Sequence, residues 1–155
     1  MTPEEALKAA TEYLRNLQAM KKKHVAVGLP ASKVADKKYA GGVSVIEVGA
    51  AHEFGTDNLD ERSFLRAPFT LKKSEINRAI QAQVAAVGAG EKDADTALNL
   101  IGIVARNISV KAFETGGYGT WPDIKEETKE AKGSSGILID TGELRGAITW
   151  EVRSE

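Results

Sequence analysis

The segment that most constrains the fold of this chain is a long apolar stretch that runs to about Phe113, with Asp93 or Asp95 as its candidate N-cap. Its apolar residues recur every three or four positions, which indicates a helix. One stripe consists of Leu98, Ile101, Ala105, Ile108 and Ala112, and a second set widens it with Leu100, Ile103, Val104 and Val110. A helix that is apolar over most of its girth is buried on more than one side. We expect a central core helix; the alternative is that part of it contacts a neighbouring subunit.

A second long helix is predicted at the N-terminus. Thr2 is a suitable N-cap, Pro3 fits the first helical position and Glu5 completes a capping box. Apolar residues then follow at helical spacing, namely Leu7, Ala10, Leu14 and Leu17. The helix should end near residues 21–23, because their lysines favour the negative end of the helix dipole.

Three further helical segments are expected. Residues 43–54 fit a helical face better than strand alternation, and Gly55 is suited to end that helix. Pro68 can start the next helix, which carries the stripe Ile76, Ile80, Val84 and Val87 and breaks at residues 88–90. Pro122 can start a short helix through Glu130, and residues 140–143 resemble a turn that leads into a helical turn.

Two short strands lie far apart in the sequence. Residues 24–29 are β-branched and are stopped by Pro30, while residues 147–152 alternate, with Ile148, Trp150 and Val152 on one face. Trp150 is expected in the core. Residues 30–42 and 56–62 are predicted loops, and residues 63–66 are short and extended. This order predicts a single α+β domain over residues 1–155, with a small, mainly antiparallel sheet packed with several helices.

Composition excludes several classes of protein. The 155 residues include 21 basic and 22 acidic side chains, so the formal net charge is −1 and strong nonspecific binding to nucleic acid is not expected. The absence of cysteine excludes disulfides, thiolate zinc sites and cysteine nucleophiles. The acidic, polar start does not match a signal peptide, and no apolar run approaches the length of a membrane span.

Three features invite a chemical interpretation. His52-Glu53 suggests acid–base or metal chemistry, but neighbours on a helix point about 100° apart and no H-E-x-x-H spacing is present. We expect instead that Glu53 caps or pairs locally and that His52 is partly exposed. Gly116-Gly117-Tyr118-Gly119 lacks the G-K-[ST] ending of a phosphate loop, so we expect a flexible loop. Lysines at 21–23 and 37–38 can touch DNA phosphates. Lysines at the end of a helix are, however, already explained by their favourable interaction with the helix dipole. We therefore assign no catalytic, cofactor or metal residue.

Three groups of motifs carry a resemblance to a known family. They appear in order along residues 24–153: Val25–Leu29; His52–Thr56 with Arg62–Pro68; and Trp121-Pro122, Thr128, Lys132-Gly133, Leu138–Arg145 and Ile148. This set resembles the virion-morphogenesis and tail-completion proteins of tailed bacteriophages and prophages, whose pattern has E-F-G-T, P-F-L-R and L-I-D-T-G-x-L-R segments. Ser63 stands where that family often has proline, and the linker at residues 88–92 is not diagnostic.

The resemblance implies a structural role without catalytic residues or cofactor. It implies a ring at the head–tail neck or tail end, with a hexamer expected because such rings commonly match the six-fold symmetry of the tail. Implied partners are other neck or tail proteins, with passing contact with genomic DNA and no membrane. The expected location is the virion, after assembly in the cytoplasm of the host bacterium.

Six residues are candidates for an interface: Phe54, Phe64, Arg66, Trp121, Leu144 and Arg145. Phe54 and Phe64 are apolar anchors that flank a polar loop, and tryptophan is enriched at binding hot spots. The arginines can pair with carboxylates at subunit edges or within the chain. Candidate patches are the second face of the 95–113 helix and the loops at 30–42, 56–62 and 114–136. The rival hypotheses are a small hydrolase or nuclease that uses His52 and nearby carboxylates, and a DNA-binding module that uses the lysine cluster.

Overall fold

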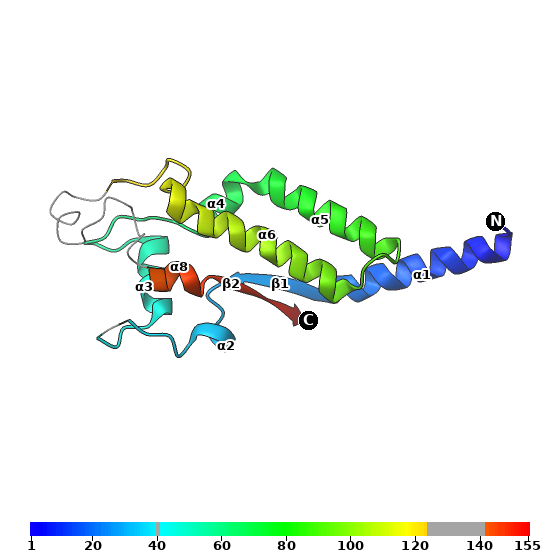
Figure 1. Cartoon of the computed structure of the whole chain (residues 1–155), viewed down its shortest axis with the longest axis horizontal. Helices are drawn as coiled ribbons and strands as arrows, with labels where there is room; N and C mark the ends of the chain where they lie inside the picture. Colours follow the sequence, from blue (N-terminus) through cyan, green and yellow to red (C-terminus); the bar gives the residue numbers. More distant parts are fainter. Residues whose placement is uncertain (40, 124–141) are drawn as a thin grey trace.

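The computed structural model describes residues 1–39, 41–123 and 142–155, which form an elongated molecule with one helix projecting from a helical body (Figure 1). Within those ranges the elements are α1 (Pro3–Lys21), β1 (Lys23–Gly28), α2 (Ala31–Val34), α3 (Val45–Phe54), α4 (Arg66–Leu71), α5 (Lys73–Gly88), α6 (Ala94–Thr115), α8 (Gly142–Ala147) and β2 (Thr149–Ser154). The predicted α+β class is confirmed. The predicted helix after Pro122 lies almost entirely outside the described ranges, and so do the motif residues Thr128, Lys132-Gly133 and 138–141.

The sheet consists of β1 and β2, which pair antiparallel with Val25 opposite Val152 and Val27 opposite Trp150. Both strands lie along α6 (Figure 1). The second strand begins two residues later than predicted, because Ala147 still belongs to α8 and the amide of Ile148 donates to the carbonyl of Arg145. Trp150 is half-buried, and its indole Nε1 donates to Asn99 Oδ1 at 2.9 Å.

Helix α6 is the centre of the core, as predicted. All five members of its main stripe are buried, from Leu98 to Ala112. Asp93 is the N-cap and accepts from the amide of Thr96 at 2.7 Å; this bond and the Thr96 hydroxyl lower the pKa of the Asp93 carboxyl. Gly116 ends the helix in the left-handed conformation with φ 61°. The wider apolar set is not fully covered, since Ile103 is exposed.

Helix α1 has the predicted capping box and then leaves the body of the molecule. The amide of Thr2 donates to Glu5 at 2.7 Å, and the amide of Glu5 donates to the Thr2 hydroxyl at 3.1 Å. Its C-terminal end joins the body through Met20, which is buried. The preceding part is exposed, with Leu7 at 70% and Leu14 at 59% exposure. The predicted apolar stripe therefore exists, but of its members only Leu17 is partly buried within the chain.

The region from α3 to α5 corrects two predictions. Helix α3 agrees with the predicted helix over 43–54 and has its own capping box between Ser44 and Glu47. The extended stretch predicted at 63–66 was wrong at its end, because α4 begins at Arg66 rather than at Pro68. A single helix after Pro68 was also wrong, since the backbone leaves helical geometry at Lys72, with φ −101° and ψ 22°. The loop predicted at 30–42 contains the short helix α2.

Two hydrophobic clusters hold the body together. The larger joins α2, α3, α6 and α8 through Val34, Val45, Phe64, Phe113, Leu144, Ala147 and Ile148. The smaller joins the end of α1 to α5 and α6 through Met20, Val87, Ala97, Leu98 and Ile101. The candidate site lies on the larger cluster, at the end of the molecule opposite the projecting helix (Figure 1).

Candidate functional site

Glu53 occupies the last turn of α3 and is a buried carboxylate, 4% exposed. Its Oε2 accepts from the amides of Phe64 at 2.8 Å and Leu65 at 3.0 Å. Its Oε1 accepts from the amide of Arg66 at 3.0 Å and the hydroxyl of Ser63 at 2.9 Å. A carboxylate is favoured at the amide end of a helix, where charged hydrogen bonds are strong. Glu53 therefore caps α4 from another helix; we call Glu53 and residues 63–66 the Glu53 cluster.

Arg66 completes the pairing of this buried charge. Its Nε donates to Glu53 Oε1 at 2.9 Å, and its Nη2 donates to the Glu53 carbonyl at 2.9 Å and to Glu61 Oε1 at 3.0 Å. The guanidinium also lies over the ring of Phe54, 4.4 Å from its centroid. Phe54 remains 61% exposed. The Glu53 cluster thus holds an arginine–phenylalanine pair at the surface.

The backbone of the turn after Phe54 requires a glycine at position 55. Gly55 has φ 72°, and a Cβ there would lie 3.0 Å from the amide nitrogen of Glu61 and 3.1 Å from the carbonyl of Leu59. Only glycine tolerates both the backbone angle and this close approach. The loop then returns to α3, where the amide of Arg62 donates to the carbonyl of His52 at 2.8 Å. Each residue of the Glu-Phe-Gly segment therefore has a distinct structural role.

Arg62 and Trp121 tie the chain after α6 to the same cluster. Arg62 is buried, and it donates from Nε to the carbonyl of Pro122 at 3.2 Å and from Nη2 to that of Asp123 at 3.3 Å. The indole Nε1 of Trp121 donates to the carbonyl of Ser63 at 2.9 Å. Trp121 is half-buried, and its ring meets Phe113 edge to face at 5.5 Å. Hydrogen bonds therefore join residues 62–63 to residues 121–123.

Two of the six predicted interface residues are corrected. Phe64 is 1% exposed and Leu144 is 0% exposed, because both point into the larger hydrophobic cluster. Phe64 packs on Phe113 with ring centroids 5.4 Å apart, and its carbonyl accepts from the buried hydroxyl of Ser109 at 2.6 Å. These two side chains stabilise the support beneath the surface and do not reach a partner.

The other four predicted residues keep part of their side chain at the surface. Arg66 belongs to the Glu53 cluster, and Phe54 and Trp121 adjoin it. Arg145 lies on α8 and pairs with Glu114 at the end of α6, with Nη2 and Oε1 2.6 Å apart. The arginines thus make contacts within the chain, and their role at an interface remains a prediction.

The His52–Glu53 pair does not offer an accessible acid–base site. His52 was expected to be partly exposed, but it is buried on α3. Both oxygens of Glu53 accept hydrogen bonds from residues 63–66, as the local capping role predicted. Among the described residues, no group of three His, Cys, Asp or Glu side chains is placed to hold a metal ion.

The lysine clusters and the glycine-rich turn are separate from this site. Residues 21–23 lie where α1 joins β1, whereas residues 37–38 follow α2 beyond the other end of that strand, so they do not form one basic patch (Figure 1). Lys23 also pairs with Asp95, its Nζ 2.6 Å from Oδ1. The turn at 116–119 is held by the hydroxyl of Tyr118, which donates to the carbonyl of Ile108 at 2.8 Å. Burial, followed by the charges of Glu75 and Glu114, raises the pKa of Tyr118.

No family model, curated protein or solved structure matches the chain. Within the described ranges, no helix is long and apolar enough to cross a membrane.

Proposed function

We propose that this chain is a structural virion protein of a tailed phage, one that forms a ring at the head–tail neck or tail end and completes the tail or joins it to the head. The observation that carries the proposal is the meeting of separate motif segments at one place. Residues 52–56, 62–68 and 121–122 carry much of the family resemblance, and they converge on the Glu53 cluster through the bonds described above. Together these segments hold the side chains of Phe54 and Arg66 at the surface.

The proposed mechanism is adhesion through a rigid, preshaped patch. The side chain of Arg66 is fixed by three acceptor oxygens and by the ring of Phe54. Little side-chain freedom is therefore lost when a neighbouring subunit covers Arg66 and Phe54. Aromatic and arginine side chains are enriched in the buried centre of interfaces. A closed ring requires two different patches on each subunit, and a hexamer is the expected ring from the family resemblance.

The proposed partners are copies of this chain and other neck or tail proteins, with at most passing contact with the genome. The proposed location is the virion, after assembly in the cytoplasm of the host bacterium. The separation of the two lysine clusters agrees with a surface that lets DNA pass without gripping it.

The role of Phe54 is tested by complementation of a phage or prophage from which this gene is deleted. We expect the deletion to yield unjoined heads and tails by electron microscopy, and the natural chain to restore infectious particles. Phe54→Ser should fold normally, because this side chain is largely exposed, but should lower the titre about tenfold or more, as loss of a hot spot does.

Val43→Ser is the matched control, because Val43 is also a large exposed apolar residue and lies outside the Glu53 cluster. It should restore the titre fully. Equal titres for Phe54→Ser and Val43→Ser would remove the role assigned to Phe54. Normal, joined particles from the deletion itself would refute the proposed function.

A further inference from the structure

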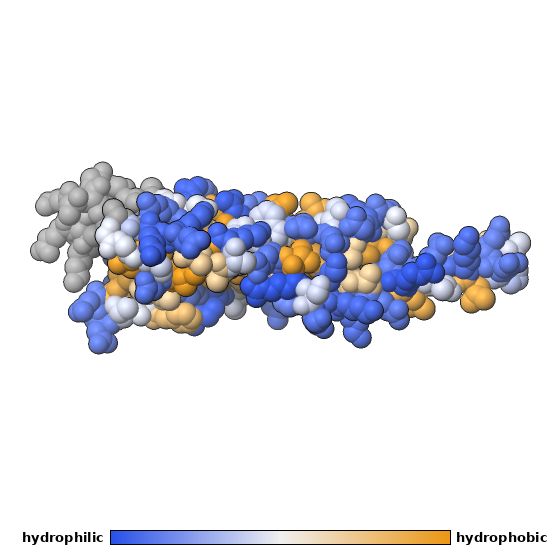
Figure 2. Space-filling view, turned by 90° about the horizontal axis from the view of Figure 1, so that it is seen from below, coloured by the Kyte–Doolittle hydropathy of each residue, from blue (hydrophilic) through white to orange (hydrophobic). Residues whose placement is uncertain are grey.

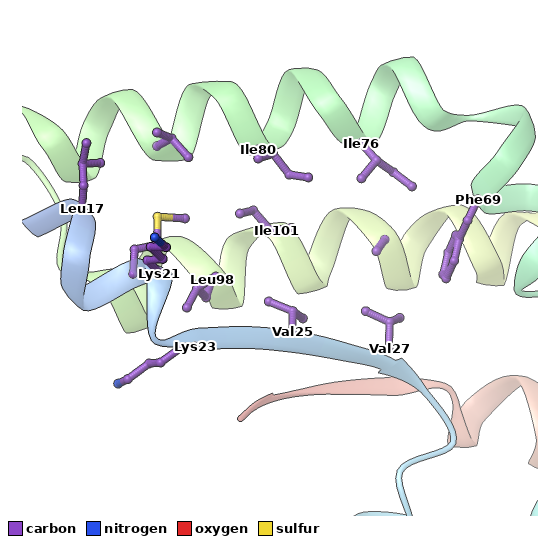
Figure 3. Close-up of a pocket in the computed structure, with 13 residues that line it drawn as sticks. Leu17, Lys21, Lys23, Val25, Val27, Phe69, Ile76, Ile80, Leu98 and Ile101 are labelled. Atoms are coloured by element: carbon purple, nitrogen blue, oxygen red, sulfur yellow. The ribbon is translucent and has the colours of Figure 1, made fainter. Parts of the chain in front are cut away.

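A wide apolar groove lies between α5, α6 and β1, and it extends from the end of α1 to Phe69 of α4. It encloses about 660 Å³ and is lined by Leu17, Met20, Lys21, Lys23, Val25, Val27, Phe69, Ile76, Ile80, Val84, Leu98, Ile101 and Ala105. Figure 3 shows Ile76 and Ile80 pointing from α5 toward Val25 and Val27 of β1. Protein interiors are close-packed, so an open apolar space of this size is suited to an occupant.

The groove is held open by the way α5 sits over α6. Gly88, at the end of α5, lies against the ring of Tyr13 in α1, so closely that a Cβ there would be 2.4 Å from Cε2. At the other end, the chain turns at Lys72, and Phe69 of α4 lies across the groove (Figure 3). Between these two ends Ile80 remains exposed. Both ends of α5 are therefore anchored while its middle leaves apolar surface uncovered.

The same chain carries a second uncovered apolar surface. Leu7, Ala10 and Leu14 follow one another at helical spacing on the projecting part of α1; we call them the α1 stripe. Leu17 continues this face into the groove, but the stripe itself lies beyond the body and is exposed. Figure 2 shows hydrophobic surface on this projecting helix as well as on the body. Because α1 is straight and points away, its stripe does not reach the groove of its own chain (Figure 1).

The stripe and the groove match in length and in charge. Leu7 to Leu14 spans about 10 Å of helix, and Ile76 to Val84 spans about 12 Å, at 1.5 Å per residue. The projecting part of α1 is net acidic, with Glu4, Glu5 and Glu12 against Lys8 and Arg15, whereas Lys21 stands at the end of the groove nearest α1 (Figure 3). An amphipathic helix in an apolar groove is a recurrent mode of recognition.

We propose that the α1 stripe of one copy docks into the groove between α5, α6 and β1 of a second copy. The two surfaces are different parts of the same chain, so the contact is heterologous and each copy can donate one helix and accept another. This supplies the two unlike patches that a closed ring needs, and in that respect the inference rests on the proposed ring.

The test uses two variants that each remove one half of the contact. Leu7→Gln with Leu14→Gln removes the stripe at exposed positions of a helix, where glutamine is a good helix former. Ile76→Gln with Ile80→Gln makes the groove polar. The matched controls are Ala9→Gln on the other side of α1, and Ala82→Gln with Ala85→Gln at exposed positions of α5. Circular dichroism and thermal unfolding establish that each variant is folded.

Light scattering over a range of concentrations then measures association. We expect the natural chain and both controls to associate, and each stripe or groove variant to remain monomeric. An equimolar mixture of the two variants should recover dimers, because the intact stripe of the groove variant fits the intact groove of the stripe variant. A contact made elsewhere gives no such rescue.

Two results would overturn this inference. Association that persists in both variants would place the contact elsewhere, while leaving the proposed ring in place. A natural chain that stays monomeric at every concentration would exclude docking between free copies. If that monomer still joined phage particles, the docking inference would be refuted while the proposed function would stand. If the groove variant alone proves unfolded, Ile80→Gln by itself replaces it, since Ile80 is exposed.

Discussion

Glu53→Ala is expected to lower the free energy of unfolding by about 3–5 kcal/mol, which is typical when one partner of a buried charged network is removed. The carboxylate accepts from three consecutive amides and a hydroxyl within residues 63–66, and it pairs with Arg66. Alanine leaves the buried amide of Phe64 and the buried hydroxyl of Ser63 without their acceptor. Urea denaturation followed by circular dichroism measures the change.

Glu61→Gln is the matched control for this prediction. Glu61 also accepts from Arg66, at 3.0 Å, but its side chain is 57% exposed. Exposed ion pairs contribute little, so we expect a loss below about 1 kcal/mol. Glu53→Gln should fall between the two, because it keeps one acceptor oxygen but introduces an amide that faces donors. Equal losses for Glu53→Ala and Glu61→Gln would show that Glu53 does not organise this region.

Phe113→Ala is expected to cost about 3–5 kcal/mol of unfolding free energy, the usual range for a buried phenylalanine. Phe113 is fully buried between Phe64 and Trp121, whose ring centroids lie 5.4 Å and 5.5 Å away. Its loss creates a cavity directly beneath the Glu53 cluster and removes the ring on which Trp121 rests. Thermal or urea unfolding, together with the fluorescence of Trp121 against a Trp150→Phe background, measures both effects.

Two comparisons make this second prediction specific. Phe113→Leu should cost less than about 1.5 kcal/mol, since much of the apolar volume is kept. Ile103→Ala, on the exposed side of the same helix, should also cost far less than Phe113→Ala. If all three variants unfold at the same urea concentration, the aromatic cluster is not what supports the site.

The helices with complete local signals were predictable from the sequence. Helix α6 has a long apolar period and Asp93 at its start, and α1 has the Thr2–Glu5 capping box. Both signals lie within a few consecutive residues, so no tertiary information is needed to find them. Periodicity identifies an apolar face but does not say what covers it. The same pattern therefore describes the buried stripe of α6 and the exposed stripe of α1.

Features that depend on contacts between distant residues were not predicted. The start of α4 at Arg66 relies on a cap supplied by Glu53, which lies 11 to 13 positions earlier than the amides it accepts from. No capping residue adjacent in the sequence marks the start of α4. The prediction that Phe64 lies at an interface failed for a related reason, because aromatic residues suit both cores and interfaces.

The candidate site was predicted in part. The local capping role of Glu53 and the surface positions of Phe54 and Arg66 agree with the structure. Arg62 and Ser109 were missed, because a buried arginine or serine is recognisable only when its acceptors are known, here the carbonyls of Pro122 and Phe64. The motif spacing around Arg62 was the one available signal. It did not show whether Arg62 stabilises the fold or contacts a partner.

The most direct test of the proposed role is the mass of the purified chain by light scattering, repeated with tail-less heads and head-less tails from mutant phage. The proposal predicts either a discrete ring, with a hexamer expected, or a monomer that joins one type of particle. A stable monomer that ignores both particle types would contradict the proposed role at the neck or tail end.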